Sequence, residues 1–246
     1  MTTRSGWLRS RGSTGAVRLV CFPHAGGTAG FYLSWARGLA SGIEVLAVQY
    51  PGREDRITEA GQEDARTTAA AVADALAGLA ERPTILFGHS LGALIAYETA
   101  RTLGGHAPAH LVVSGRRAPA DEVGGDLHRQ DDDALVDELD RLGGVGTELL
   151  RDPAVRPVFL PSIRADFRVA ETYRHRHGPP LTCPVTAVIG TEDTEVDAVQ
   201  AGRWAETTRG PFTLHTLPGG HFYLLPRQAA VHDLLRRLSP AGALSS

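Results

Sequence analysis

The chain has 246 residues, of which 42% are hydrophobic and 22% are charged, which is the composition of a folded globular domain. The length suits one compact domain with an insertion and is short for two independent cores, so we expect a single domain over residues 1–246. A formal net charge of −3 argues against a nucleic-acid or other polyphosphate partner, because such partners need a basic face.

The sequence also carries no signal for a membrane or for export. No stretch approaches the roughly 18 consecutive apolar residues that a membrane span requires. The N-terminal segment MTTRSGWLRSRGSTG lacks the apolar core of a secretory signal. Cys21 and Cys183 lie in or beside apolar runs and are expected to be buried free thiols. We therefore expect a cytoplasmic monomer with no membrane partner.

Short apolar runs along the chain predict the strands of a buried sheet. In chain order the expected strands are Arg18–Phe22, Glu44–Gln49, Thr84–Phe87, His110–Ser114, Pro184–Ile189 and Phe212–Leu217. Nearly continuous apolar strands that alternate with helices indicate a mostly parallel sheet with helices on both faces, an α/β fold. The first fifteen residues and Ala241–Ser246 show no such pattern and are expected to be a loose lead-in and a frayed tail.

Helical patterns fill the intervals between the strands. We expect helices near residues 29–40, 63–80, 91–103, 197–208 and 223–238. The alternation is interrupted once, over residues 121–180, where the strand pattern is absent and the helix-like segments Asp132–Leu142 and Ile163–Tyr173 occur. This stretch lacks the strand–helix rhythm of a second domain. We expect it to be a helical lid inserted over one edge of the sheet.

The segment Gly88-His89-Ser90-Leu91-Gly92 is the most informative motif. It places a serine in a G-x-S-x-G pattern directly after an expected strand and directly before an expected helix. A serine at the tip of such a turn is exposed at the edge of the sheet, and the flanking glycines let neighbouring backbone approach closely. The alternative is an ordinary glycine-rich turn, but the context on both sides favours Ser90 as a nucleophile.

A serine hydroxyl needs a base to remove its proton. His221 lies just after the last expected strand, in Pro218-Gly219-Gly220-His221, at the carboxyl edge of the sheet where Ser90 is also expected. The other histidines considered are His24, His89, His175 and His177. His89 adjoins Ser90 on the sharp turn and should point away from it, and His24 is better placed to shape the loop after the first strand. His175 and His177 fall in the insertion and are expected to be solvated.

The base in turn needs a carboxylate that fixes its orientation and stabilises its charged form. Asp193 follows the expected strand that ends at Ile189, in Gly190-Thr191-Glu192-Asp193. Glu192 and Asp197 are the alternatives, but Glu192 adjoins the end of the strand and Asp197 is placed to cap the next helix. The resulting order Ser, Asp, His is the order of the α/β-hydrolase fold, so we expect that fold.

An oxyanion that forms at Ser90 needs two backbone donors. The amide of Leu91, at the start of a helix, is the first. The second is expected from the loop Phe22-Pro23-His24-Ala25-Gly26-Gly27, where we assign the amide of Ala25. A phosphate-binding glycine loop is the alternative, but the G-x-G-x-x-G spacing and the Walker lysine are both absent. No cofactor and no metal is expected.

At this point the sequence resembles a known family, the stand-alone type II thioesterases that accompany modular polyketide and non-ribosomal peptide synthases. The motifs that carry the resemblance are FPHAGG at 22–27, YPGR at 50–53, GHSLGA at 88–93, LPSIRADF at 160–167, ETY at 171–173 and GGHF at 219–222. The resemblance extends from about residue 17 to residue 238. By this resemblance Ser90, Asp193 and His221 take the catalytic positions of the family, and Ala25 and Leu91 take its oxyanion positions.

The resemblance implies that an acyl or peptidyl carrier protein brings the substrate, an acyl group on its phosphopantetheine arm. The implied role is to remove aberrant or stalled acyl groups as free acids. The alternatives are an esterase or lipase for free small esters, an offloading cyclase, and an inactive binding module. Carrier proteins are typically acidic, so Arg116-Arg117 and the run Arg174–His177 are either a docking surface or an ordinary solvated face.

Overall fold

The structure is a computed structural model and describes residues 2–12, 14–39, 42–144 and 146–239. The strands are β1 (Thr2–Ser5), β2 (Leu8–Ser10), β3 (Val17–Phe22), β4 (Ile43–Val48), β5 (Thr84–His89), β6 (His110–Ser114), β7 (Val185–Gly190) and β8 (Phe212–Leu217). They form one sheet of eight strands in the order β1-β2-β4-β3-β5-β6-β7-β8. From β4 to β8 all neighbours are parallel, and β1 and β2 are antiparallel additions at one edge.

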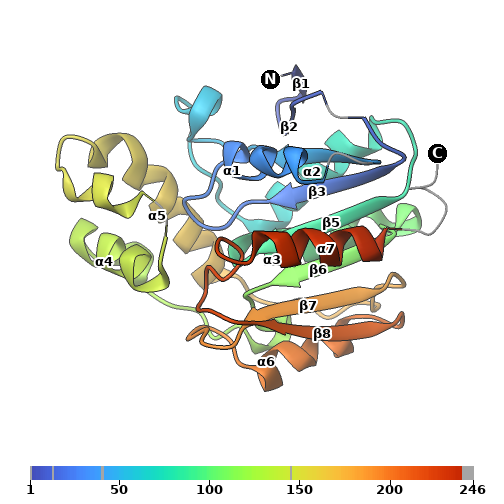
Figure 1. Cartoon of the computed structure of the whole chain (residues 1–246). Coiled ribbons are helices and arrows are strands. Elements are labelled where there is room, and N and C mark those ends of the chain that lie inside the picture. The colour runs from blue at the N-terminus through green and yellow to red at the C-terminus, as the bar shows by residue number, and fades with distance from the viewer. Residues whose placement is uncertain (1, 13, 40–41, 145, 240–246) are drawn as a thin grey trace.

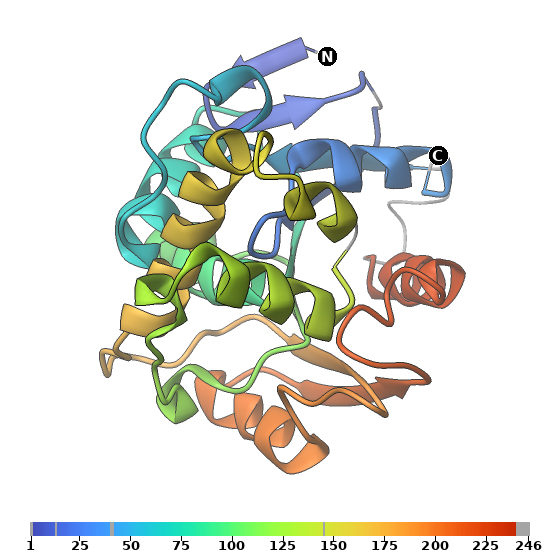
Figure 2. The same ribbon diagram turned by 90° about the vertical axis from the view of Figure 1, so that its left-hand side faces the viewer.

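The α-helices are α1 (Ala29–Leu33), α2 (Ala65–Ala77), α3 (Leu91–Leu103), α4 (Asp132–Leu142), α5 (Arg156–Thr172), α6 (Ala198–Gly202) and α7 (Gln228–Leu238). Helices α1 and α7 cover one face of the sheet, and α2, α3 and α6 cover the other (Figure 1). Helices α4 and α5 stand beyond the carboxyl ends of the strands, and Figure 2 looks onto this side. The mostly parallel α/β sheet that the sequence predicted is confirmed.

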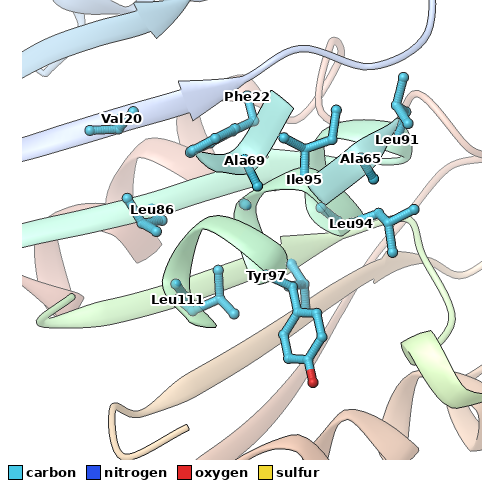
Figure 3. Packing of buried hydrophobic residues seen from close by; sticks show 14 of the residues in the cluster. Val20, Phe22, Ala65, Ala69, Leu86, Leu91, Leu94, Ile95, Tyr97 and Leu111 are labelled. Atoms are coloured by element: carbon cyan, nitrogen blue, oxygen red, sulfur yellow. The ribbon is translucent and has the colours of Figure 1, made fainter. Parts of the chain in front are cut away.

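Helix α3 is buried on almost every side, which fixes the position of the residue that precedes it. Figure 3 shows Leu94 and Ile95 of α3 among side chains of α2 and of the sheet, including Leu86 and Leu111. All four side chains are fully buried, and each such burial contributes about 1.5–3 kcal/mol. The apolar face of α3 therefore anchors its N-terminus at the sheet edge where Ser90 lies.

The expectation of a loose N-terminal lead-in was wrong. Strands β1 and β2 form an antiparallel pair, and β2 continues onto β4 through Leu8 opposite Val48. The Leu8 side chain is fully buried. These strands are too short to show an alternating pattern, and their stability comes from hydrogen bonds to the edge of a sheet formed by distant residues. The tail Ala241–Ser246 lies outside the described residues.

Two helix boundaries differ from the sequence expectation because of prolines. Helix α5 begins at Arg156, seven residues before the expected start, since Pro157 lies in its first turn, where a missing N–H costs nothing. Helix α7 begins at Gln228 and not at Tyr223, because the residue before Pro226 is disfavoured in a helix. Cys21 and Cys183 are buried free thiols as expected. Within the described ranges, each helix is too short or too polar to cross a bilayer.

Candidate active site

Ser90 lies in a strained turn between β5 and α3. Its backbone has φ 52° and ψ −120°, a conformation that costs a non-glycine residue about 1–3 kcal/mol. The turn needs glycine on both sides: a Cβ on Gly88 would lie 2.1 Å from the carbonyl oxygen of Gly92, and a Cβ on Gly92 would lie 2.0 Å from that of Phe22. The Ser90 amide donates to the carbonyl of Ser114 at 2.8 Å. The strained turn is thus held in place by the neighbouring strand.

His221 and Asp193 come from the loops after β8 and β7 and lie in contact. The Nδ1 atom of His221 is 3.1 Å from each carboxylate oxygen of Asp193, and both side chains are almost completely buried. Asp193 also accepts a hydrogen bond from the Glu195 amide at 2.9 Å. When Nδ1–H donates to the carboxylate, the neutral imidazole has an unprotonated Nε2. That nitrogen is the acceptor that a serine hydroxyl requires.

Ser90 and His221 line one cavity of about 310 Å³ at the carboxyl edge of the sheet. Among the described residues, no hydrogen bond joins the Ser90 hydroxyl to the His221 ring. Such bonds are often long in free enzymes and shorten when substrate binds. The three predicted residues are therefore in one site, with the His221–Asp193 link formed and the Ser90–His221 link still open.

The two residues predicted as oxyanion donors also line this cavity. Leu91 is the first residue of α3, and its amide has no acceptor within the helix. Ala25 lies in the loop after β3, where the next two amides are already used: Gly26 donates to Asp166 at 2.8 Å and Gly27 donates to the His24 carbonyl at 2.9 Å. The amides of Ala25 and Leu91 therefore remain the predicted oxyanion donors.

His89 is fully buried between His221 and His24, and His24 is half-buried at the cavity. The ring of His89 is 4.9 Å from that of His221 and 5.8 Å from that of His24. Burial, together with the nearby His221, lowers the pKa of His24 to about 3 and the pKa of His89 well below its usual value. Both rings are therefore neutral at physiological pH. His89 is bonded to the hydroxyl of Ser114 at 2.8 Å and not to Ser90.

A buried chain of hydroxyl groups fixes the proton on His89. Tyr223 donates to the carbonyl of Val188 at 3.1 Å, so Ser114, which lies 2.6 Å from the Tyr223 hydroxyl, must donate to it. Ser114 can then only accept from His89, which places the His89 proton on Nδ1. The buried Nε2 of His89 has no partner among the described residues. In this tautomer it carries no proton, so no buried N–H is left unpaired.

Replacing Tyr223 with phenylalanine is expected to destabilise the fold by about 1–3 kcal/mol. Without the Tyr223 oxygen, the Ser114 hydroxyl must either lose its acceptor or donate to His89, which would move the His89 proton to an unpartnered nitrogen. The matched control is Tyr32→Phe, because the buried Tyr32 hydroxyl has no hydrogen-bond partner among the described residues. Urea unfolding of both variants checks this: equal losses of stability would contradict the argument.

Helix α5 is attached to the loop of Ala25 by a buried ion pair that the sequence did not reveal. Asp166 of α5 is fully buried and accepts hydrogen bonds from Arg53 at 2.7 and 2.8 Å. It also accepts from Gln62 at 2.7 Å and from the Gly26 amide at 2.8 Å. The motifs PHAGG, YPGR and RADF thus meet at one carboxylate. Arg53 and Asp166 stand in the motifs YPGR and RADF, but nothing in the sequence indicates that the two motifs are in contact.

Helices α4 and α5 and the segment before them form the wall of the cavity that faces the sheet edge. Its apolar lining residues from this insert are Leu127, Leu139, Leu142, Phe167 and Ala170. Phe222 and Leu91 complete the apolar surface near Ser90. An acyl chain attached to Ser90 would therefore have apolar surface beside it. His175 and His177, which lie at 5.2 Å from one another, do not line this cavity.

Residues 17–240 match the family described as the thioesterase domain. A probable cadicidin biosynthesis thioesterase of Streptomyces griseus is 41% identical over 243 residues, which cover 97% of this chain and 67% of that protein. Among solved structures, the type II thioesterase BorB from the borrelidin biosynthetic cluster is 43% identical with a TM-score of 0.90, covering 97% of this chain and 99% of that one.

A second similar structure comes from a pathway that combines non-ribosomal peptide and polyketide synthesis. The type II thioesterase YbtT from the yersiniabactin NRPS/PKS biosynthetic pathway is 29% identical, with a TM-score of 0.82 and coverage of 96% of this chain and 97% of that one. Sequence motifs, sheet order and backbone thus agree over nearly the full length. The chain therefore belongs to the thioesterase family, whose type II members it resembles, and it is a serine hydrolase with the α/β-hydrolase fold.

Proposed function

We propose that this enzyme hydrolyses acyl thioesters through an acyl-serine intermediate, with Ser90 as nucleophile, His221 as base and Asp193 as the orienting acid. The observation that carries the proposal is the buried His221–Asp193 pair. The Nδ1 atom of His221 lies 3.1 Å from both carboxylate oxygens of Asp193. His221 lines the active-site cavity together with Ser90. A serine in a strained turn and a correctly oriented base are what nucleophilic acyl transfer needs.

In the first half-reaction, Ser90 Oγ attacks the carbonyl carbon of the thioester while His221 Nε2 takes the hydroxyl proton. The carbonyl oxygen becomes an oxyanion that the amides of Ala25 and Leu91 stabilise, and one such donor is worth about 10²–10³ in rate. Asp193 stabilises the imidazolium that forms. The carbon–sulfur bond then breaks, the proton on His221 passes to the sulfur, and the thiol leaves.

In the second half-reaction, water replaces the thiol. His221 takes a proton from water as the water oxygen attacks the acyl-serine carbonyl, and the same two amides hold the second oxyanion. When the bond to Ser90 Oγ breaks, His221 returns its proton to that oxygen. The products are a free carboxylic acid and regenerated Ser90.

We propose that the substrates are acyl groups on the phosphopantetheine arm of an acyl or peptidyl carrier protein, and that the enzyme removes aberrant or stalled groups. The relatives from the borrelidin and yersiniabactin pathways support this substrate class. We further propose that residues 121–180 act as a lid within one domain, because α4 and α5 line the cavity. A monomer in the cytoplasm remains our prediction, and size-exclusion chromatography with light scattering tests the monomer.

The substrate class is tested by comparing an acyl-carrier protein with a p-nitrophenyl ester of the same acid. We expect kcat/KM to be higher for the carrier-bound thioester by about tenfold or more, which corresponds to ~1.4 kcal/mol of transition-state binding. Mass analysis of the released product should show the free acid. A ring product would indicate a cyclase, and a clear preference for the free ester would contradict the proposal in favour of an esterase.

A further inference from the structure

A second cavity, of about 490 Å³, lies on the outer side of α3 away from Ser90. It is formed by the second half of α3, the start of α2 and the segment that follows α5. Its charged lining residues are Arg66, Glu98, Arg101 and Arg176, and its apolar lining includes Pro179 and Leu181. We call this cavity, together with the adjoining Arg174, the arginine groove.

The arginine groove holds more positive than negative charge. Glu98 is its buried carboxylate and lies 3.6 Å from Arg66 and 3.4 Å from Arg101, and it also accepts from the Tyr173 hydroxyl at 2.5 Å. Arg174 donates only to backbone carbonyls, and Arg176 forms no ion pair within the described ranges. Four guanidinium groups are thus balanced by one carboxylate, in a chain whose net charge is −3.

The His175 ring lies close to the charged residues of the arginine groove. Burial lowers the pKa of His175, Arg101, His177 and Arg66 lower it further, and Glu98 acts in the opposite direction. Its ring is packed at 6.3 Å from Tyr97, over which the Arg101 guanidinium also lies at 5.6 Å. The groove therefore disfavours another cation and favours an anionic partner.

The other two arginines that the sequence put forward for docking lie outside the arginine groove. Arg116 donates two hydrogen bonds of 2.6 Å to the carboxylate of Glu122. Arg117 donates to the Glu195 carbonyl at 2.6 Å, which supports the loop of Asp193. Arg116 is thus neutralised by Glu122, whereas Arg117 keeps its charge but lines the active-site cavity and not the arginine groove. The docking hypothesis for the groove therefore concerns Arg174 and Arg176.

The arginine groove adjoins the wall of the active-site cavity. Gly124 and Glu171 line that cavity, and a Cβ on Gly124 would lie only 3.2 Å from Arg174 Nη1. Arg101 lies eleven residues along α3 from Ser90, a rise of roughly 16 Å along the axis. A protein seated on the groove would therefore stand beside the site, within reach of a long flexible arm.

We propose that the arginine groove is the docking surface for the carrier protein, and that it receives an acidic, amphipathic helix of that partner. This inference rests on the proposed function. The guanidinium groups of Arg66, Arg101, Arg174 and Arg176 match acidic side chains, and the apolar lining matches the apolar side of the same helix. The carbonyl-bound Arg174 is held in place, so less side-chain entropy is lost when a partner binds.

The test is the double variant Arg174→Glu/Arg176→Glu, assayed on an acyl-carrier protein and on the same acyl group on N-acetylcysteamine. We expect KM for the carrier substrate to rise about tenfold, because two attractive contacts become repulsive. For the N-acetylcysteamine thioester, both kcat and KM should be unchanged. The difference in carrier-protein KM between the variant and the unmodified enzyme should shrink at high salt. The reason is that the electrostatic screening length falls from about 10 Å at 0.1 M to about 3 Å at 1 M.

The matched control is Arg37→Glu/Arg237→Glu, which makes the same charge change on the opposite face of the sheet. Both of these arginines are exposed. An equal rise in KM for the control would show a general charge effect and overturn the docking surface, as would equal effects on the two substrates or no effect on either. Failure of the unmodified enzyme to hydrolyse the acyl-carrier protein would instead contradict the proposed function.

Discussion

Replacing Ser90 with alanine is expected to lower kcat by about 10⁶-fold, and His221→Ala should lower it by a similar factor, because the two residues act as one unit. The expectation follows from the geometry around the turn. Ser90 supplies the atom that bonds to the acyl carbon, and the His221 ring, held by Asp193 at 3.1 Å, is the available base in the cavity. Release of free acid from an acyl-carrier protein measures this loss.

The alanine variant is a clean comparison because it leaves the strained backbone as it is. The positive φ of Ser90 costs alanine as much as serine, so the thermal unfolding curve should hardly change. A fluorophosphonate probe should label the unmodified enzyme and fail to label Ser90→Ala. Retention of substantial turnover by Ser90→Ala would refute the assignment of the nucleophile. Absence of labelling of the unmodified enzyme would support an inactive binding module.

Replacing Asp166 with alanine is expected to cost about 3–5 kcal/mol of folding stability. The variant leaves the guanidinium of Arg53, which is 4% exposed, in the interior without a counter-charge, and it removes the acceptors of Gln62 and of the Gly26 amide. Because Asp166 also holds the Gly26 amide next to Ala25, the fraction that remains folded should lose part of its turnover as well. Urea unfolding monitored by tryptophan fluorescence gives the change in free energy.

The matched control for Asp166→Ala lies in the same insert. Asp132 forms an ion pair with Arg164 at 2.6 Å, but its side chain is 51% exposed, and exposed pairs of this kind contribute about 0–1 kcal/mol. Asp132→Ala should therefore leave the unfolding midpoint almost unchanged. If the two alanine variants lost similar stability, burial of the Arg53–Asp166 pair would not be the source of its strength.

The sequence predicted the parts of the molecule that depend on neighbouring residues. Apolar runs located all six strands of the parallel array, and the G-x-S-x-G pattern placed Ser90 at its turn because strand, serine and helix are contiguous. His221 and Asp193 were chosen by their position after strands. The structure confirms that the two side chains are in contact. Their catalytic roles stay predictions.

Features that join distant segments were not predictable in the same way. The Arg53–Asp166 pair spans 113 positions, and nothing near either residue indicates that the other will lie beside it. The pairing of β2 with β4 depends on a sheet edge that does not exist locally. The arginines of the docking hypothesis looked alike in the sequence, and only the structure shows that Arg116 is paired with Glu122.

The buried attachment of α5 has a consequence for how a bulky thioester enters. Helix α5 is fixed by a desolvated ion pair, whereas α4 is joined to the loop of Asp193 by Arg141, which contacts Glu195 at 2.5 Å while 45% exposed. Water can replace that outer contact at little cost. We therefore expect the entrance to widen more readily on the side of α4, whose polar anchor is exposed, than on the side of α5, whose anchor is buried.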